Sequence, residues 1–196
     1  MWIIQYPKHA ITRDPDYLAY CDASFASEFG SKCRYGYLYK FLGCLVSWTS
    51  VHTTRVLTSS TEAECHSIVH TAKENQWVRD FIRKLKLDTS NEPTTIYQDN
   101  MGAIALMKGG GDHKRSKHFT IEFDALREYV REKEIDIKYI ETEKMPADVL
   151  TKSLGKSIFQ IHRDSIIKGN GQRSTINKYV DGCGVERGSK DINREE

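Results

Sequence analysis

The chain has 196 residues, of which 39% are hydrophobic, 10% aromatic and 29% charged, a mixture typical of one globular domain with or without a tail. Its net charge of +2 is too small for binding nucleic acid by overall charge alone, although it allows a local basic patch. No apolar run reaches the ~18–20 residues of a membrane span, and residues 1–7 are too short and polar for a signal peptide. Five widely spaced cysteines without a C-x-x-C pair favour reduced thiols over zinc or disulfides.

Five strands are predicted from short apolar, aromatic or alternating runs. They lie at residues 17–22, 35–42, 44–48, 94–99 and 135–140. Gly43 separates the second run from the third, which indicates a β-hairpin.

Four helices are predicted, either from apolar residues at helical spacing or from a proline that favours a first helical turn. They cover about residues 60–85, residues 102–108, the segment that contains Phe119, Phe123, Leu126 and Val130, and a short final segment that Pro146 begins.

The order β-β-β-α-β-α-α-β-α predicts an α/β fold with a mixed sheet covered by helices. We place the folded domain at residues 17–163. Residues 1–16 are an N-terminal extension, and residues 164–196 are a polar tail without apolar periodicity that we expect to be disordered.

Four acids fall at the ends of predicted elements. Asp22 and Asp99 close strands, whereas Glu64 and Asp148 lie in the first turns of helices. If these acids converge, each pair repels by roughly 3 kcal/mol at ~5 Å and an effective dielectric constant of 20, so such a cluster needs a cation. Oxygen ligands with room for water suit Mg²⁺ or Mn²⁺, and two such ions ~4 Å apart hydrolyse phosphodiesters.

Each acid also fits a purely structural role. Asp148 in a first turn is favoured by the helix dipole, and Asp99 is compatible with capping the next helix. Glu64 fits a capping box that begins at Thr61, while Ser59 and Glu62 fit one equally well. Spacing alone leaves these alternatives open.

Six short motifs occur along the chain. They are Tyr20-Cys-Asp-Ala-Ser24, Gly43-Cys-Leu-Val-Ser-Trp48, Ser59-Ser-Thr-Glu-Ala-Glu64, Tyr97-Gln-Asp-Asn100, His113-Lys-Arg-Ser-Lys-His118 and Ala147-Asp-Val-Leu-Thr-Lys152. Each is weak alone, but as an ordered set over residues 17–163 they closely resemble the ribonuclease H domain of copia-type LTR retrotransposon Pol polyproteins.

The resemblance implies a ribonuclease H-like fold, with a mixed five-stranded sheet covered by helices on both faces. It implies an endonuclease that cleaves the RNA strand of RNA–DNA hybrids with two Mg²⁺ ions, for which Mn²⁺ can substitute. Asp22 would contact both ions, Glu64 and Asp99 would complete one coordination shell, and Asp148 would hold the second ion. Hybrids would be recognised through 2′-hydroxyls in a wide minor groove.

Glu62 and Glu64 lie about 200° apart around a helix, so only one of them can face the sheet. The phase set by Val78, Phe81 and Ile82 places Glu64 near the apolar face and Glu62 nearly opposite. We therefore predict Glu64 as the ligand, with Glu62 solvated or capping.

Histidine and basic residues suggest two further sites. The resemblance assigns contacts with nucleic acid to His113, Lys114, Arg115, Lys117 and His118, together with Lys152. A solvated basic helix start explains the 113–118 segment equally well. His66 and His70 have zinc-ligand spacing, but Ser67 stands where a glutamate base is needed and no third ligand is evident, which disfavours zinc catalysis.

The chain departs from the family in two places that bear on activity. Residues 119–124 carry acids where the family has basic residues, and residues 141–146 lack the histidine that some ribonucleases H place before the last aspartate. A relic that binds nucleic acid without useful turnover is therefore the alternative function. A DDE-type transposase fits less well, because its final carboxylate would lie on a later helix.

The resemblance also indicates the setting in which the domain works. The expected partners are an RNA–DNA hybrid and a reverse transcriptase domain, with residues 1–16 a remnant of the polyprotein connection, and no membrane partner is expected. The expected location is intracellular, either a cytoplasmic virus-like particle or the nucleus. The sequence makes no prediction about oligomeric state.

Overall fold

The computed structural model describes residues 17–25, 32–54, 57–87, 92–109 and 120–167. Five strands form one mixed sheet in the order β3-β2-β1-β4-β5. The strands are β1 (Tyr17–Ser24), β2 (Arg34–Phe41), β3 (Cys44–His52), β4 (Thr94–Gln98) and β5 (Ile135–Tyr139). The three N-terminal strands pair antiparallel, and β1, β4 and β5 pair in parallel. The predicted mixed five-stranded sheet and its hairpin are confirmed.

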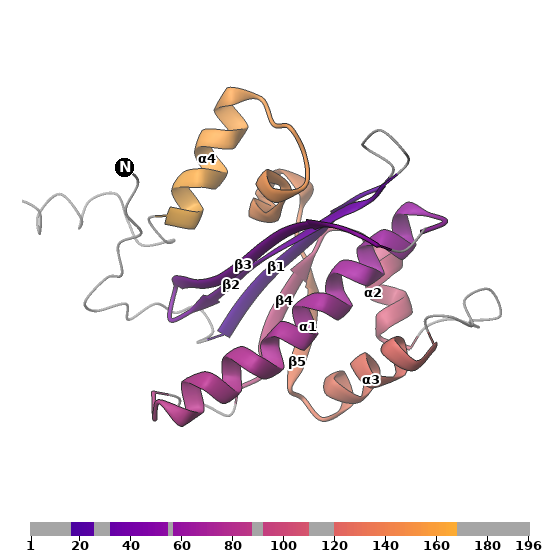
Figure 1. Cartoon of the computed structure of the whole chain (residues 1–196), viewed down its shortest axis with the longest axis vertical. Coiled ribbons are helices and arrows are strands. Elements are labelled where there is room, and N and C mark those ends of the chain that lie inside the picture. The colour runs from indigo at the N-terminus through magenta and orange to yellow at the C-terminus, as the bar shows by residue number, and fades with distance from the viewer. Residues whose placement is uncertain (1–16, 26–31, 55–56, 88–91, 110–119, 168–196) are drawn as a thin grey trace, which may run out of the picture.

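Helices cover both faces of this sheet, as predicted (Figure 1). One face packs against α1 (Ser60–Lys84), and α2 (Met101–Met107) and α3 (Thr120–Arg131) lie beside α1 and contact the edge strand β5. The other face carries α4 (Lys156–Ile167) and the 3-10 helix η2 (Pro146–Leu150), which follows a second short 3-10 helix, η1 (Thr142–Lys144). Among the described helices, none is both long and apolar enough to cross a membrane.

The main hydrophobic core lies between α1 and the sheet. Every residue of β1 is buried, and its side chains Ala19, Cys21 and Ala23 pack with Ile68 and Ala72 of α1. A smaller cluster on the opposite face joins Leu18 and Tyr20 to Met145 and Ala147, on either side of Pro146. The central strand is thus held from both sides, which fixes its carboxyl end.

Two differences from the sequence prediction concern the C-terminal part. The short helix that begins at Pro146 is a 3-10 helix, in which the Thr151 N–H donates to the Asp148 carbonyl three residues earlier. Helix α4 is absent from the predicted elements, and it continues to Ile167, past the boundary placed at residue 163. The extension at 1–16 and most of the tail lie outside the described residues.

Helix α4 is not among the predicted elements, and none of its described apolar side chains is fully buried. Ile158, Phe159 and Ile161 are exposed, and His162 is the one described residue of α4 that is fully buried. The helix is instead tied to the sheet by Lys40, a buried residue of β2 whose ammonium donates to the Ser165 carbonyl at 3.0 Å. Lys40 and Ser165 are 125 residues apart in the sequence, so no local pattern predicts this contact.

Candidate active site

Asp22 lies near the carboxyl end of β1 and is completely buried. The Lys152 ammonium donates to its Oδ1 atom at 3.0 Å, and the Thr151 hydroxyl donates to its Oδ2 atom. A carboxylate placed in the middle of a sheet loses its hydration, and these two donors replace part of it.

Asp99 follows β4 directly, and β4 runs parallel to β1, so both acids lie at the same edge of the sheet. Asp99 is not the cap of the next helix, because the Asn100 side chain accepts the Ala103 N–H at 2.9 Å. The Asp99 carboxylate instead accepts a hydrogen bond from the Thr142 hydroxyl at 3.0 Å. The capping alternative for Asp99 is thus wrong, and its side chain is available to the site.

Asp148 reaches this edge from η2, and Gly36 makes the approach possible. Gly36 lies opposite Asp22 in the β1–β2 register, and a Cβ atom there would lie 2.6 Å from the Leu150 Cβ. Ser50 of β3 fixes the same helix by donating its hydroxyl to the Leu150 carbonyl at 2.5 Å. Asp148 is consequently buried beside Asp22.

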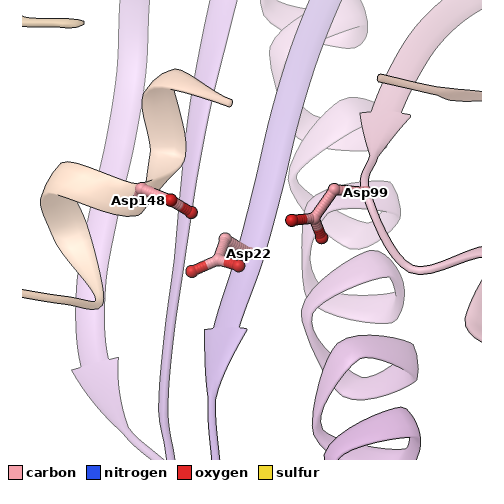
Figure 2. A group of neighbouring side chains, drawn as sticks. All are labelled: Asp22, Asp99 and Asp148. Carbon is pink, nitrogen blue, oxygen red and sulfur yellow. The ribbon is translucent and has the colours of Figure 1, made fainter. Parts of the chain in front are cut away.

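The three aspartates form one cluster, in which one carboxylate oxygen from each lies within 4.8 Å of the others. Figure 2 shows their carboxyl groups pointing toward one another from β1, from the end of β4 and from η2. Burial, and then the charge of Asp22, raises the pKa of Asp148 to about 6. A cation among these oxygens would relieve both the burial cost and the repulsion.

Glu64 lies on the buried face of α1, outside this group of three. Its Oε2 atom accepts from the Gln98 amide at 3.1 Å. Burial, followed by the charges of Asp22 and Asp99, raises the pKa of Glu64 to about 9. Gln98, which donates to Glu64, directly precedes Asp99, so Glu64 lies next to the cluster.

Glu62 has a different place, at the start of the same helix. Ser59 is the cap residue, since its hydroxyl accepts the Glu62 N–H at 3.1 Å, and the Glu62 carboxylate accepts from the Thr58 hydroxyl at 2.7 Å. Of the two cap residues compatible with the sequence, Ser59 and Thr61, the structure uses Ser59. The predicted orientation of the two glutamates is confirmed.

Gln98, Thr142 and Thr151 were missed by sequence reasoning. Gln98 is completely buried, and its carbonyl oxygen accepts the N–H groups of Asp99 and Asn100 at 2.7 and 3.1 Å while its amide donates to Glu64. Its position in the sequence, at the end of an apolar strand and next to the candidate acid Asp99, could have indicated that Gln98 belongs to the site. Gln98 links Glu64 to the backbone that carries Asp99.

The residues predicted to contact nucleic acid divide into two groups. Lys152 lies in the site, with its ammonium 3.0 Å from both Asp22 Oδ1 and Asp148 Oδ1. The remaining five residues, His113, Lys114, Arg115, Lys117 and His118, lie outside the described residues.

The histidine pair on α1 forms an aromatic cluster with β2. The rings of His66 and His70 have centroids 4.4 Å apart, and His70 Nδ1 lies 3.3 Å from the Tyr35 hydroxyl. Within the described part of the chain, neither histidine belongs to a group of three side chains arranged to hold a metal ion. The cysteines at described positions, Cys21, Cys33, Cys44 and Cys65, are free thiols.

The structure has a ribonuclease H-like fold. One helix packs along the central strands of the sheet, and the acids lie at the edge shared by β1 and β4. The structure is similar to LC11-RNase H1 in complex with an RNA/DNA hybrid, with a TM-score of 0.52 and 16% identity over 69% of this chain and 93% of that one. It is also similar to the foamy viral protease-reverse transcriptase in complex with an RNA/DNA hybrid, with a TM-score of 0.50 and 13% identity over 74% of this chain and 22% of that one. The fold predicted from the motifs is confirmed.

The chain is a homologue of retrotransposon Pol polyproteins. It is 32% identical, over 154 residues, to the Retrovirus-related Pol polyprotein from transposon TNT 1-94 of Nicotiana tabacum. That match covers 78% of this chain and 11% of the polyprotein, so the chain corresponds to about a tenth of its relative. No protein-family model matches the chain.

Proposed function

We propose that this chain is the ribonuclease H domain of a copia-type retrotransposon Pol polyprotein, a metal-dependent endonuclease that cleaves the RNA strand of RNA–DNA hybrids. The observation that carries the proposal is the cluster of Asp22, Asp99 and Asp148, which three separate segments bring within 4.8 Å in a ribonuclease H-like fold. Because buried acids repel one another, a fold that gathers three of them is built to receive a cation.

The donor set fits Mg²⁺, with Mn²⁺ as a substitute. All three clustered groups are carboxylates, which are the ligands these hard ions prefer. The raised pKa values of Glu64 and Asp148 are those expected of buried acidic ligands without their cation. When bound, two such ions supply charge that activates water and stabilises the attacking and leaving oxygens of a phosphodiester.

The protein's own residues would divide the remaining work. Asp22 lies between Asp99 and Asp148 and would bind both ions, Glu64 and Asp99 would hold one of them, and Asp148 would hold the other. Gln98 would orient Glu64 through its amide, and Thr142 would orient Asp99 through its hydroxyl. Both donors are uncharged, so they fix a carboxylate without cancelling the charge that the ion needs.

Two similar structures support the choice of substrate. LC11-RNase H1 and the foamy viral protease-reverse transcriptase were both solved in complex with an RNA/DNA hybrid. Residues His113, Lys114, Arg115, Lys117 and His118 would contact phosphate beside the site. A reverse transcriptase domain of the same polyprotein is the proposed protein partner, and the proposed location is a cytoplasmic virus-like particle or the nucleus.

A transposase of the same fold class is disfavoured by two features. The acid next to the aspartate cluster on the first helix, Glu64, is one that such an enzyme would not need. On the last helix, where its final carboxylate would lie, Asp164 pairs with the neighbouring Arg163 at 2.7 Å.

The test is cleavage of a labelled RNA–DNA hybrid by the purified chain, with Mg²⁺, Mn²⁺ or EDTA. We expect metal-dependent nicking of the RNA strand, reduced on the order of 10³-fold or more in Asp22→Asn. Asp80→Asn, at an exposed aspartate of α1, is the matched control and should cleave at the wild-type rate. Cleavage by Asp22→Asn at the wild-type rate would refute the site. A folded chain that binds the hybrid without cleaving it would indicate the relic.

A further inference from the structure

The Asp22–Asp148 side of the site already contains a cation, the ammonium of Lys152. It lies 3.0 Å from one oxygen of each aspartate, and these are its ion pairs within the described part of the chain. The side chains of Asp22 and Asp148 are 0% and 8% exposed, whereas that of Lys152 is 36% exposed. The ammonium therefore closes a buried pair of acids from the solvent side.

The local chain fixes this arrangement. Asp148 and Lys152 are separated by one turn, and the Lys152 N–H donates to the Asp148 carbonyl at 2.9 Å. The preceding residue, Thr151, is buried and donates its hydroxyl to the other oxygen of Asp22. The segment from Asp148 to Lys152 thus brings one of the acids, a hydroxyl donor and a positive charge to Asp22 together.

An ammonium and a divalent ion cannot both bridge these two oxygens. Mg²⁺ binds carboxylate oxygens at about 2.0–2.1 Å, inside the space that the ammonium fills at 3.0 Å, and the two cations would repel one another strongly there. Glu64, in contrast, has the uncharged Gln98 amide as its hydrogen-bond donor.

We propose that Lys152 is a built-in counter-cation that holds Asp22 and Asp148 together in the metal-free protein and must leave them before a divalent ion can bind between them. This inference rests on the metal site of the proposed function. Its consequence is an asymmetric site, in which the ion shared by Asp22 and Asp148 binds more weakly than it would without the lysine. Lys152 is a positioning residue here, which differs from the direct contact with nucleic acid expected from the sequence.

The test compares Lys152→Met, which keeps the length of the side chain but removes its charge, with the wild type. In EDTA, we expect the Tm of Lys152→Met to be lower by about 5 °C, because two buried acids lose their cation. Calorimetric titration should show Mn²⁺ binding about tenfold more tightly to Lys152→Met, because no ammonium competes. Saturating Mn²⁺ should then raise the Tm of the variant more than that of the wild type.

Two further variants serve as controls. Lys73→Met removes an ammonium that lies at the same 3.0 Å from Glu122 but on an exposed side chain, and it should change neither the Tm in EDTA nor Mn²⁺ affinity. Lys152→Arg keeps a positive charge and should keep most of the Tm in EDTA. If Lys152→Met does not fold, the Tm in EDTA and the affinity for Mn²⁺ are measured on Lys152→Gln instead.

Unchanged Tm in EDTA together with unchanged or weaker Mn²⁺ binding in Lys152→Met would overturn the inference. In that case, a raised KM for the hybrid alone would make Lys152 a phosphate-binding residue. Failure of the proposed function is a separate result, because a wild-type chain that does not cleave hybrids can still show the expected shifts in Tm and Mn²⁺ affinity.

Discussion

The negative charges of the acidic site are balanced differently on its two sides, the Asp22–Asp148 side and the Glu64 side. Asp22 and Asp148 share the ammonium of Lys152, whereas Glu64 has a neutral amide donor in Gln98 and feels the negative charges of both Asp22 and Asp99. The chain has thus balanced one pair of buried acids with its own charge and left the other side dependent on protonation or on an external cation.

The difference shows how a fold can keep a metal site folded before the metal arrives. Four buried acids without any positive charge nearby would oppose folding. If positive groups of the protein balanced all four acids, the site would have little affinity for a metal ion. The site of this chain is intermediate between these two cases, because Lys152 balances the charge on one side and Glu64 is protonated on the other. Substitutions on either side of the cluster therefore have different expected consequences.

After Asp22→Asn, the largest loss of cleavage is expected from Glu64→Gln, which removes the acid next to the uncharged donor Gln98. Cleavage of the hybrid should fall about 10²-fold or more, because one ion loses a charged ligand while the amide keeps the shape of the side chain. Single-turnover cleavage at saturating Mg²⁺ measures this loss.

Glu62→Gln is the matched control, two residues away on the same helix. It should change cleavage less than twofold and cost roughly 0.5–1 kcal/mol of stability, because Glu62 belongs to the cap of α1. A larger loss of cleavage in Glu62→Gln than in Glu64→Gln would show that the helix faces are assigned the wrong way round.

On the compensated side, Gly36→Ala should displace the helix that carries Asp148. The added methyl group would lie 2.6 Å from the Leu150 Cβ, so η2 must move away from Asp22. We expect about a tenfold loss of cleavage and roughly 1–3 kcal/mol of destabilisation, measured by hybrid cleavage and chemical denaturation.

Gly155→Ala provides the comparison, because a Cβ atom at Gly155 meets nothing within 4 Å. It should cleave normally and lose less than about 1 kcal/mol, the cost of a poorer cap for α4. Equal behaviour of the two alanine variants would mean that close packing of η2 against β2 does not set the position of Asp148.

A pH dependence of stability is also expected in the absence of metal. The pKa of Glu64 is raised from 4.5 to about 9 in the folded chain, so between these values the folded state keeps a proton that the unfolded state releases. The free energy of unfolding should therefore fall as pH rises through this window, by at most about 1.4 kcal/mol per pH unit. Asp148, with its pKa raised to about 6, adds a decline of the same sign at lower pH.

Thermal unfolding in EDTA from pH 5 to pH 9 measures this decline, and Glu64→Gln should flatten its upper part. Added Mg²⁺ should also flatten it in the wild type, because the ion replaces the proton. A wild-type Tm that rises from pH 6 to pH 9 in EDTA would contradict the burial of Glu64 among negative charges.

Much of the fold could be predicted from the sequence because its signals are local. The apolar, aromatic or alternating runs of the five strands and the apolar spacing along α1 reflect which side chains face the core, and these patterns can be read from the sequence. The order of the elements then limits the sheet to few topologies. Helix α4 was not predicted, and the contact between Lys40 and Ser165 that ties it to the sheet joins residues far apart in the sequence.

By itself, the sequence determined the five strands, the phase that turns Glu64 toward the sheet and the candidate acids at element ends, because periodicity and position along an element follow from local geometry. Only the tertiary structure decided how those acids are balanced. The close approach at Gly36, the links made by Gln98 and the Lys152 ammonium between Asp22 and Asp148 join segments up to 130 residues apart. Charge compensation depends on distances across the fold, and no local pattern records them.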